Sequence, residues 1–172
     1  MGWYVLFVET GYEDKFCRYA RKIINQQYKE LEYSLLVPKR KIFERKQGIR
    51  REVIKIIFPG YVFLETDSIL DFFFQTRNSP HLIRFLRDDC HFLEVKREEI
   101  KPILLLIDSD GIIELSKAFI EDDVVKIKEG PLRGMEGVIK KIDKRKGRAK
   151  VSFILNECHI LIDLGIEILN KR

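Results

Sequence analysis

Cationic side chains crowd one short part of the sequence, residues 133–150, where eight basic residues stand against two acidic ones. Lysine and arginine neutralise phosphate groups, so a local excess of this size favours a polyanionic partner over general solubility. The alternative is a solvated basic loop. The candidate phosphate-binding residues are Arg133, Lys140, Lys141, Lys144, Arg145, Lys146, Arg148 and Lys150.

A second basic stretch, Lys39–Arg51, contains seven basic residues and only one acidic residue, Glu44. Gln47 and Gly48 lie near its middle and are typical of a turn. The stretch therefore predicts a basic β-hairpin that projects from a sheet. Nucleic acid, with DNA as the candidate, is one possible partner, and a solvated, mobile hairpin is an equally good interpretation.

Residues able to do covalent chemistry form no recognisable constellation. The sequence has no phosphate-binding loop of the Walker type, no nucleophile elbow and no zinc-protease helix motif. The histidines and cysteines are His81, His91, His159, Cys17, Cys90 and Cys158. Two adjacent Cys-His pairs exist, but adjacent residues of a strand point to opposite faces and are poorly placed to bind one ion. We therefore predict a binding protein with no catalytic residue, metal or cofactor.

Strand-like alternation positions the basic residues of the later stretch. Val125 shares a face with Ile127, while lysines occupy the other face. Gly130 and Pro131 then break the run. Two further strands are expected at 138–142 and 148–153, joined by a turn in which Gly147 adopts positive φ. Gly134 and Gly137 are expected to permit close backbone approach.

Two motifs in this chain resemble those of a known family. The run VVKIKEGPLRGMEGVIKKID resembles a KOW motif, the small barrel module of transcription elongation factors and some ribosomal proteins. The runs WYVLFVETGYE and IIFPGYVFLET resemble the N-terminal domain of NusG-type transcription factors. The resemblance implies an α+β fold: a NusG N-terminal α/β sandwich at 1–108, a linker at 109–120 and a KOW β-barrel at 121–172. Because Ile112–Ile120 is rich in apolar residues, we expect this linker to dock rather than swing, and to couple the two domains rigidly.

Local signals predict helices in the first domain. Thr10 and Glu13 have the spacing of a capping box and predict a helix that runs to about Tyr28. Ser68 precedes a predicted short helix over 69–75 that contains three consecutive phenylalanines. One buried face cannot hold all three, so part of this aromatic cluster is expected to be exposed and to meet a partner. For each single ring, packing on both sides of the short helix is the alternative. A further helix is predicted within 96–107.

The family resemblance implies a polymerase-binding surface. In NusG-type factors the N-terminal domain binds the clamp helices of RNA polymerase through an aromatic-lined pocket. The matching residues here are Phe7, Tyr61, Phe63 and Leu82. Aromatic and aliphatic anchors are typical hot spots of protein interfaces, and ordinary core packing is the alternative for each of them.

Departures from the general family pattern favour a specialised member. RfaH-like paralogues carry a His-Thr-Thr element, whereas this chain has Asp71-Phe72-Phe73 in that region. General NusG proteins place an aromatic residue in a Phe-Gly-Arg loop that meets the ribosome or Rho, whereas Ile154 stands there in this chain. The combination is most similar to the LoaP class, which antiterminates long biosynthetic operons and recognises an RNA hairpin.

Three functions remain open at this point. The first is a specialised antitermination factor that binds RNA polymerase and a nascent RNA hairpin. The second is a general NusG elongation factor that couples polymerase to Rho or the ribosome. The third is an enzyme or ribosome-assembly protein with a KOW tail. Because residues 1–14 lack the basic start of a secretory signal and no apolar run reaches about 18 residues, we expect a cytoplasmic monomer without membrane contact.

Overall fold

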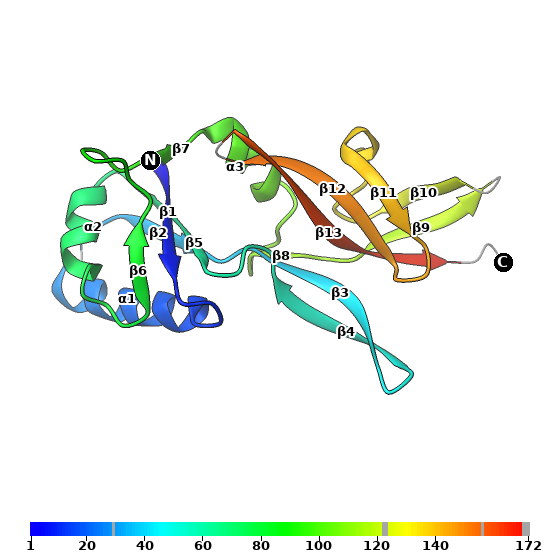
Figure 1. Ribbon diagram of the computed structural model, residues 1–172, viewed down its shortest axis with the longest axis horizontal. Coiled ribbons are helices and arrows are strands. Elements are labelled where there is room, and N and C mark those ends of the chain that lie inside the picture. The colour runs from blue at the N-terminus through cyan, green and yellow to red at the C-terminus, as the bar shows by residue number, and fades with distance from the viewer. Residues whose placement is uncertain (29, 122–123, 156, 170–172) are drawn as a thin grey trace. The chain divides into compact units, whose positions relative to one another are not determined.

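The computed structural model describes residues 1–28, 30–121, 124–155 and 157–169 (Figure 1). The chain divides into two compact units. The first consists of Met1–Val37 and Phe58–Arg97. The second consists of Pro38–Ile57 and the chain from Glu98 onward. The predicted domain limits at residues 108 and 120 stay a prediction.

An antiparallel sheet forms the centre of the first unit. Its strands are β1 (Gly2–Val8), β2 (Tyr33–Leu36), β5 (Tyr61–Thr66), β6 (Leu82–Phe85) and β7 (Glu94–Val95). The order is β2-β5-β1-β6, and β7 pairs with a different part of β1. The fully buried residues of the central strands include Leu6, Val62 and Leu64, so the core lies along β1 and β5.

Two helices pack beside this sheet, α1 (Glu13–Gln27) and α2 (Ile69–Thr76) (Figure 1). Helix α2 inserts Phe72 between Tyr33 and Phe85, with ring centroids 5.5 and 6.3 Å away. Phe72 is fully buried while Phe74 is 56% exposed, so the expected division of the phenylalanine cluster is confirmed. Helices on a sheet make this unit the predicted α/β sandwich.

The start of α1 differs from the predicted capping box. Tyr12 is the N-cap residue and makes no side-chain capping hydrogen bond. Glu13 is buried instead, and its Oε1 accepts a hydrogen bond of 2.6 Å from the backbone amide of Gly60. Gly60 has φ of +85° in the turn before β5. The capping-box prediction was wrong because the Glu13 carboxylate accepts its hydrogen bond from the amide of Gly60, which is distant in sequence, and not from an amide at the start of the helix.

A curled five-stranded sheet forms the larger part of the second unit. Its strands are β9 (Ser116–Glu121), β10 (Val124–Glu129), β11 (Ile139–Asp143), β12 (Arg148–Leu155) and β13 (Cys158–Leu169), accompanied by η1 (Glu136–Val138) and α3 (Arg97–Leu104). The order is β10-β9-β13-β12-β11, and only the β9–β13 pairing is parallel. The outer strands β10 and β11 line a common groove, so the sheet curls on itself. This agrees with the predicted small KOW barrel, and the α+β fold class is confirmed.

The predicted basic hairpin is present as β3 (Lys39–Lys46) and β4 (Ile49–Ile56), the cyan ribbon of Figure 1. Gln47 and Gly48 connect them with φ of +52° and +80°, as a type I′ turn requires. The hairpin belongs to a separate three-stranded sheet, β4-β3-β8, in which β8 (Ile112–Ile113) pairs parallel to β3. The residues of the predicted linker form β8 and β9 within the second unit, with Ile113 and Ala118 buried. Rigid coupling of the two domains stays a prediction.

Close backbone approach fixes the hairpin against the curled sheet. A Cβ atom added at Gly165 of β13 would collide with the carbonyl oxygen of Lys41 and with a methyl group of Leu115. The expected close approach at Gly134 and Gly137 was wrong, because a Cβ at either position meets no atom within 4 Å. The close approach is therefore at Gly165 within strand β13, and the turn motifs of the sequence did not predict it.

Candidate nucleic-acid interface

A cationic cleft lies between the hairpin and the β11–β12 turn, and has a volume of about 460 Å³. Its lining contains five basic residues, one carboxylate and one aromatic ring. These residues, which define the cationic cleft, are Phe43, Glu44, Arg45, Arg50, Arg145, Lys146 and Arg148. Two stretches that the sequence offered as separate basic candidates thus contribute to one site.

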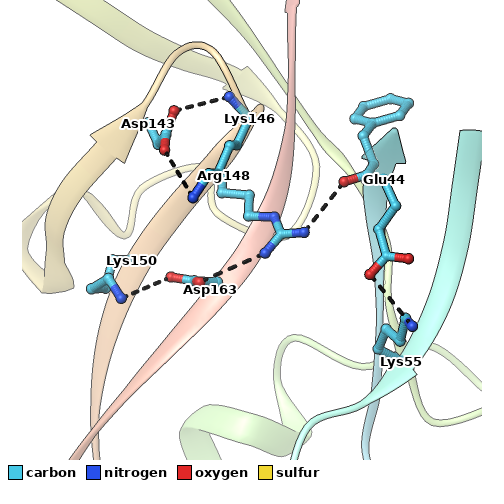
Figure 2. A network of polar contacts seen from close by, with 8 residues as sticks. Glu44, Lys55, Asp143, Lys146, Arg148, Lys150 and Asp163 are labelled. Atoms are coloured by element: carbon cyan, nitrogen blue, oxygen red, sulfur yellow. Dashed lines mark hydrogen bonds and ion pairs between the residues drawn. The ribbon is translucent and has the colours of Figure 1, made fainter. Parts of the chain in front are cut away.

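The hairpin wall of the cleft concentrates positive charge. Arg45 and Arg50 are direct cross-strand partners. Like charges in this arrangement destabilise a strand pair. The Arg50 guanidinium lies 3.5 Å from the centroid of the Phe43 ring, which holds it by a cation–π contact. Glu44 is 3.4 Å from Lys55, so the one carboxylate of the lining already has a cationic partner (Figure 2).

The turn wall is ordered by Asp143. One oxygen of its carboxylate accepts a hydrogen bond of 2.9 Å from the backbone amide of Lys146, and the other lies 4.0 Å from the Lys146 ammonium. Gly147 follows with φ of +63°, which confirms the predicted conformation of this turn. The side chains of Arg145 and Lys146 remain exposed to solvent.

Arg148 connects the two walls, as Figure 2 shows. Its Nη2 donates to the carbonyl oxygen of Phe43 at 3.4 Å, and its Nη1 lies 3.9 Å from Asp163. The same Asp163 carboxylate is 3.2 Å from the Lys150 ammonium. Two cations therefore share one carboxylate, and the seam between hairpin and sheet keeps a positive balance.

Arg40 adds further charge to this seam. Burial lowers the pKa of its guanidinium, Asp163 acts in the opposite direction, and Arg148 adds to the lowering. The Nε atoms of Arg40 and Arg148 are buried, and neither has a hydrogen-bond partner among the residues that the structure describes. Buried donors without an acceptor are costly, so the seam contains two guanidinium groups whose hydrogen bonding is incomplete within the described ranges.

A second site, the basic groove, lies between the outer strands β10 and β11 and has a volume of about 680 Å³. It combines apolar side chains with lysines: Val124, Val125, Lys126, Ile127, Lys128, Ile139, Lys140, Lys141, Ile142 and Lys144. Glu121 engages two of these lysines, at 2.8 Å from Lys126 and 3.7 Å from Lys128.

The structure thus separates the eight predicted phosphate-binding residues. Three of them line the cationic cleft and three line the basic groove. Arg133 is exposed and lines neither, while Lys150 is half-buried beside Asp163. The register pairs Lys150 with Lys141. Sequence reasoning missed the role of Asp163, which has no local signal.

The predicted polymerase-binding residues lie around one face of the first unit's sheet. Phe7 and Tyr61 are direct cross-strand partners with ring centroids 4.8 Å apart, and both are half-buried. Arg84, which sequence reasoning missed, places its guanidinium 4.7 Å from the Phe7 ring. Leu82 lies two residues away on β6 and is half-buried. Phe63 is fully buried and packs on Phe58, with ring centroids 5.6 Å apart.

The remaining reactive side chains are scattered. His81 stacks on Tyr12 at 3.9 Å and bonds to Glu9 at 2.8 Å. Cys17 is buried, whereas Cys90 and Cys158 are exposed free thiols. Within the described ranges no group of three or more His, Cys, Asp or Glu side chains could hold a metal ion. None of the helices in those ranges has the length and apolarity needed to cross a membrane.

Comparisons with known proteins agree with this architecture. The family model described as "Transcription termination factor nusG" matches residues 1–104, and the KOW motif model matches residues 121–152. NusG of Haemophilus influenzae, a "transcription termination/antitermination protein", is 28% identical over 153 residues, which cover 87% of this chain and 83% of the relative. The corresponding protein of Halalkalibacterium halodurans is 26% identical over 167 residues, 94% of each chain.

A solved structure of Thermotoga maritima NusG has the same fold, with a TM-score of 0.52 and 24% identity over 95% of this chain and 93% of that one. The α/β sandwich and the curled KOW sheet correspond to the two modules that the family models match. Since the family model covers more than half of the sequence, the chain belongs to the NusG family.

Proposed function

We propose that this protein is a specialised antitermination and elongation factor of the NusG family, similar to the LoaP class. It binds the clamp helices of RNA polymerase through the first unit and a structured leader RNA through the basic loops of the KOW module. The observation that carries the proposal is the concentration of cations on and beside the β11–β12 hairpin, three of which line the cationic cleft. Such a surface suits a folded polyanion.

The polymerase contact uses the face formed by Phe7, Tyr61, Leu82 and Arg84. Partly exposed aromatic rings beside an arginine have the composition of interface hot spots. Phe63 supports this face from within the core, since its side chain is fully buried. A pull-down with core RNA polymerase tests the contact, and a folded protein that does not bind polymerase would instead fit an enzyme or a ribosome-assembly protein.

The RNA contact is tested with the triple variant Lys144→Ala, Arg145→Ala, Lys146→Ala. If about three to five phosphates are contacted, the logarithm of the affinity falls with the logarithm of salt concentration at a slope of roughly −2 to −4. The triple variant should weaken binding of an RNA hairpin and flatten this slope, while polymerase binding stays unchanged. Gel-shift titrations at several salt concentrations measure both quantities.

A matched control removes the same charge elsewhere: Lys15→Ala, Arg18→Ala, Lys22→Ala on the exposed side of α1. This control should bind the RNA hairpin like the parent. Equal hairpin affinity of the parent and the Lys144–Lys146 variant would place the RNA contact elsewhere.

General NusG activity is the second candidate, favoured by the similarity to termination/antitermination proteins over most of the chain. Such a factor would couple polymerase to Rho or the ribosome. Ile154 stands where the resemblance expects an aromatic contact residue, and its side chain is 48% exposed. Pull-downs with purified Rho and with ribosomes distinguish this candidate. We further propose a cytoplasmic monomer, which size-exclusion chromatography can check.

A further inference from the structure

We infer that the cationic cleft is one composite site, in which the β3–β4 hairpin and the β11–β12 turn together grip the sugar–phosphate backbone of an RNA stem. This inference rests on the proposed RNA binding and assigns half of the contact to the hairpin. The walls of the cleft come from residues 43–50 and 145–148, about a hundred positions apart in sequence.

The charge balance of the cleft calls for an anion. Five basic side chains line it, and its single carboxylate, Glu44, is 3.4 Å from Lys55. Arg45 and Arg50 stand directly opposite each other, an arrangement that repels in the free protein. A phosphate between them would replace this repulsion by two charge-assisted hydrogen bonds.

Arg148 connects the two walls of the cleft in the free protein. It joins the walls through the Phe43 carbonyl and keeps a buried Nε that lacks a partner within the described chain. The close contact between Gly165 and the Lys41 carbonyl holds the hairpin against the sheet at the same seam. The two walls are therefore positioned before the ligand arrives, which reduces the entropy lost on binding. Arg148 therefore acts as a positioning residue.

The shape of the site favours an RNA stem over a single strand. Single-strand sites offer open aromatic faces on which bases stack. The one ring of this cleft, Phe43, is covered by Arg50 at 3.5 Å. A-form RNA has a deep, narrow major groove flanked by the phosphates of both strands. Two cationic walls that face one cleft match such a backbone better than they match the wide major groove of B-form DNA.

The test uses the full chain and two double variants of the same hairpin. Arg45→Ala with Arg50→Ala removes both cleft-facing charges. Lys46→Ala with Arg51→Ala removes the same charge from exposed residues that do not line the cleft. The probes are a fluorescent RNA stem-loop of about one helical turn and a DNA stem-loop of the same sequence, read by anisotropy over a series of potassium chloride concentrations.

The cleft variant should lower the steepness of the salt dependence by about 2, one for each lost phosphate contact, and weaken RNA binding roughly tenfold or more. The control should change RNA affinity by less than about twofold, as expected for charges outside the contact. Thermal melting of each variant establishes that it is folded. If the alanine variant is unfolded, Arg45→Gln with Arg50→Gln replaces it and keeps the longer side chains.

The outcomes separate the two proposals. If the parent binds the RNA stem and the cleft variant has the same RNA affinity as the parent or as the control, the composite site is refuted while the proposed RNA binding stands. A parent that binds neither probe overturns the proposed RNA binding itself. Tighter binding of the DNA stem, with the same loss in the cleft variant, makes the cleft a DNA site and overturns the assignment to RNA.

Discussion

Replacing Gly165 by alanine should separate the basic hairpin from the curled sheet. The added methyl group would meet the Lys41 carbonyl and a Leu115 methyl, with the Ile42 Cα at 3.2 Å. The leucine side chain can rotate away. The carbonyl belongs to strand β3, so relief of this collision requires the whole strand to move. The φ of Gly165 is not positive, and the backbone itself therefore accepts alanine without strain.

The magnitude follows from overpacking of a closely packed seam, which costs about 1–3 kcal/mol. For a chain of this length each kcal/mol lowers the melting temperature by roughly 2–4 °C. We expect the Gly165→Ala variant to melt about 2–12 °C below the parent. Because β3 must move to relieve the collision, we also expect the hydrogen bond from Arg148 to the Phe43 carbonyl to be lost and amide exchange of β3 to accelerate.

Differential scanning calorimetry and hydrogen exchange of the same samples measure both responses. The control is Gly137→Ala, which adds the same methyl group where nothing lies within 4 Å. This control should melt close to the parent. A Gly165→Ala variant with unchanged melting temperature and unchanged exchange of β3 would show that the hairpin does not pack on β13 in solution.

Three further predictions concern single side chains. Glu13→Ala should lower the free energy of unfolding in urea by about 1–3 kcal/mol, because the buried Gly60 amide loses its acceptor; an unchanged value would contradict the burial of this carboxylate. Phe63→Ala should lower the free energy of unfolding by about 3–5 kcal/mol in the same assay. Tyr61→Ala should keep the fold and weaken polymerase binding by about 1–3 kcal/mol. An unfolded Tyr61→Ala variant beside a stable Phe63→Ala variant with weakened polymerase binding would make Tyr61 the core residue and Phe63 the contact residue. A hydrogen bond to Glu114 raises the pKa of Lys41 above its ordinary value of 10.5, so the stability contributed by this ion pair is complete below pH 10.5 and is lost as the pH rises through the raised pKa. The parent should therefore be more stable than Lys41→Met at neutral pH and lose this difference only in strongly alkaline solution. Loss of the difference near neutral pH would refute the ion pair.

The sequence by itself determined the elements and the family. Alternation around Val125 and Ile127 marked a strand with a lysine face, because strand side chains repeat every second residue. Gln47-Gly48 and Gly147 marked turns, because these positions need positive φ. The NusG and KOW motifs carried the family assignment, and the excess of basic residues predicted a polyanionic partner, which stays a prediction.

The tertiary structure decided which surfaces meet. Side-chain period tells which residues share a face of a strand, but it does not tell which face of a distant strand they will contact. The hairpin packs against the curled sheet at Gly165, where a side chain would collide with strand β3. In the sequence this glycine shows only that a side chain is absent, which does not identify the strand that it will contact. The acceptor for Arg148 is a main-chain carbonyl, which every residue possesses, so no sequence pattern could single it out. Phe63 is buried while Tyr61 is half-buried, and this difference depends on which elements cover the sheet. The local sequence of β5 does not show which elements these are.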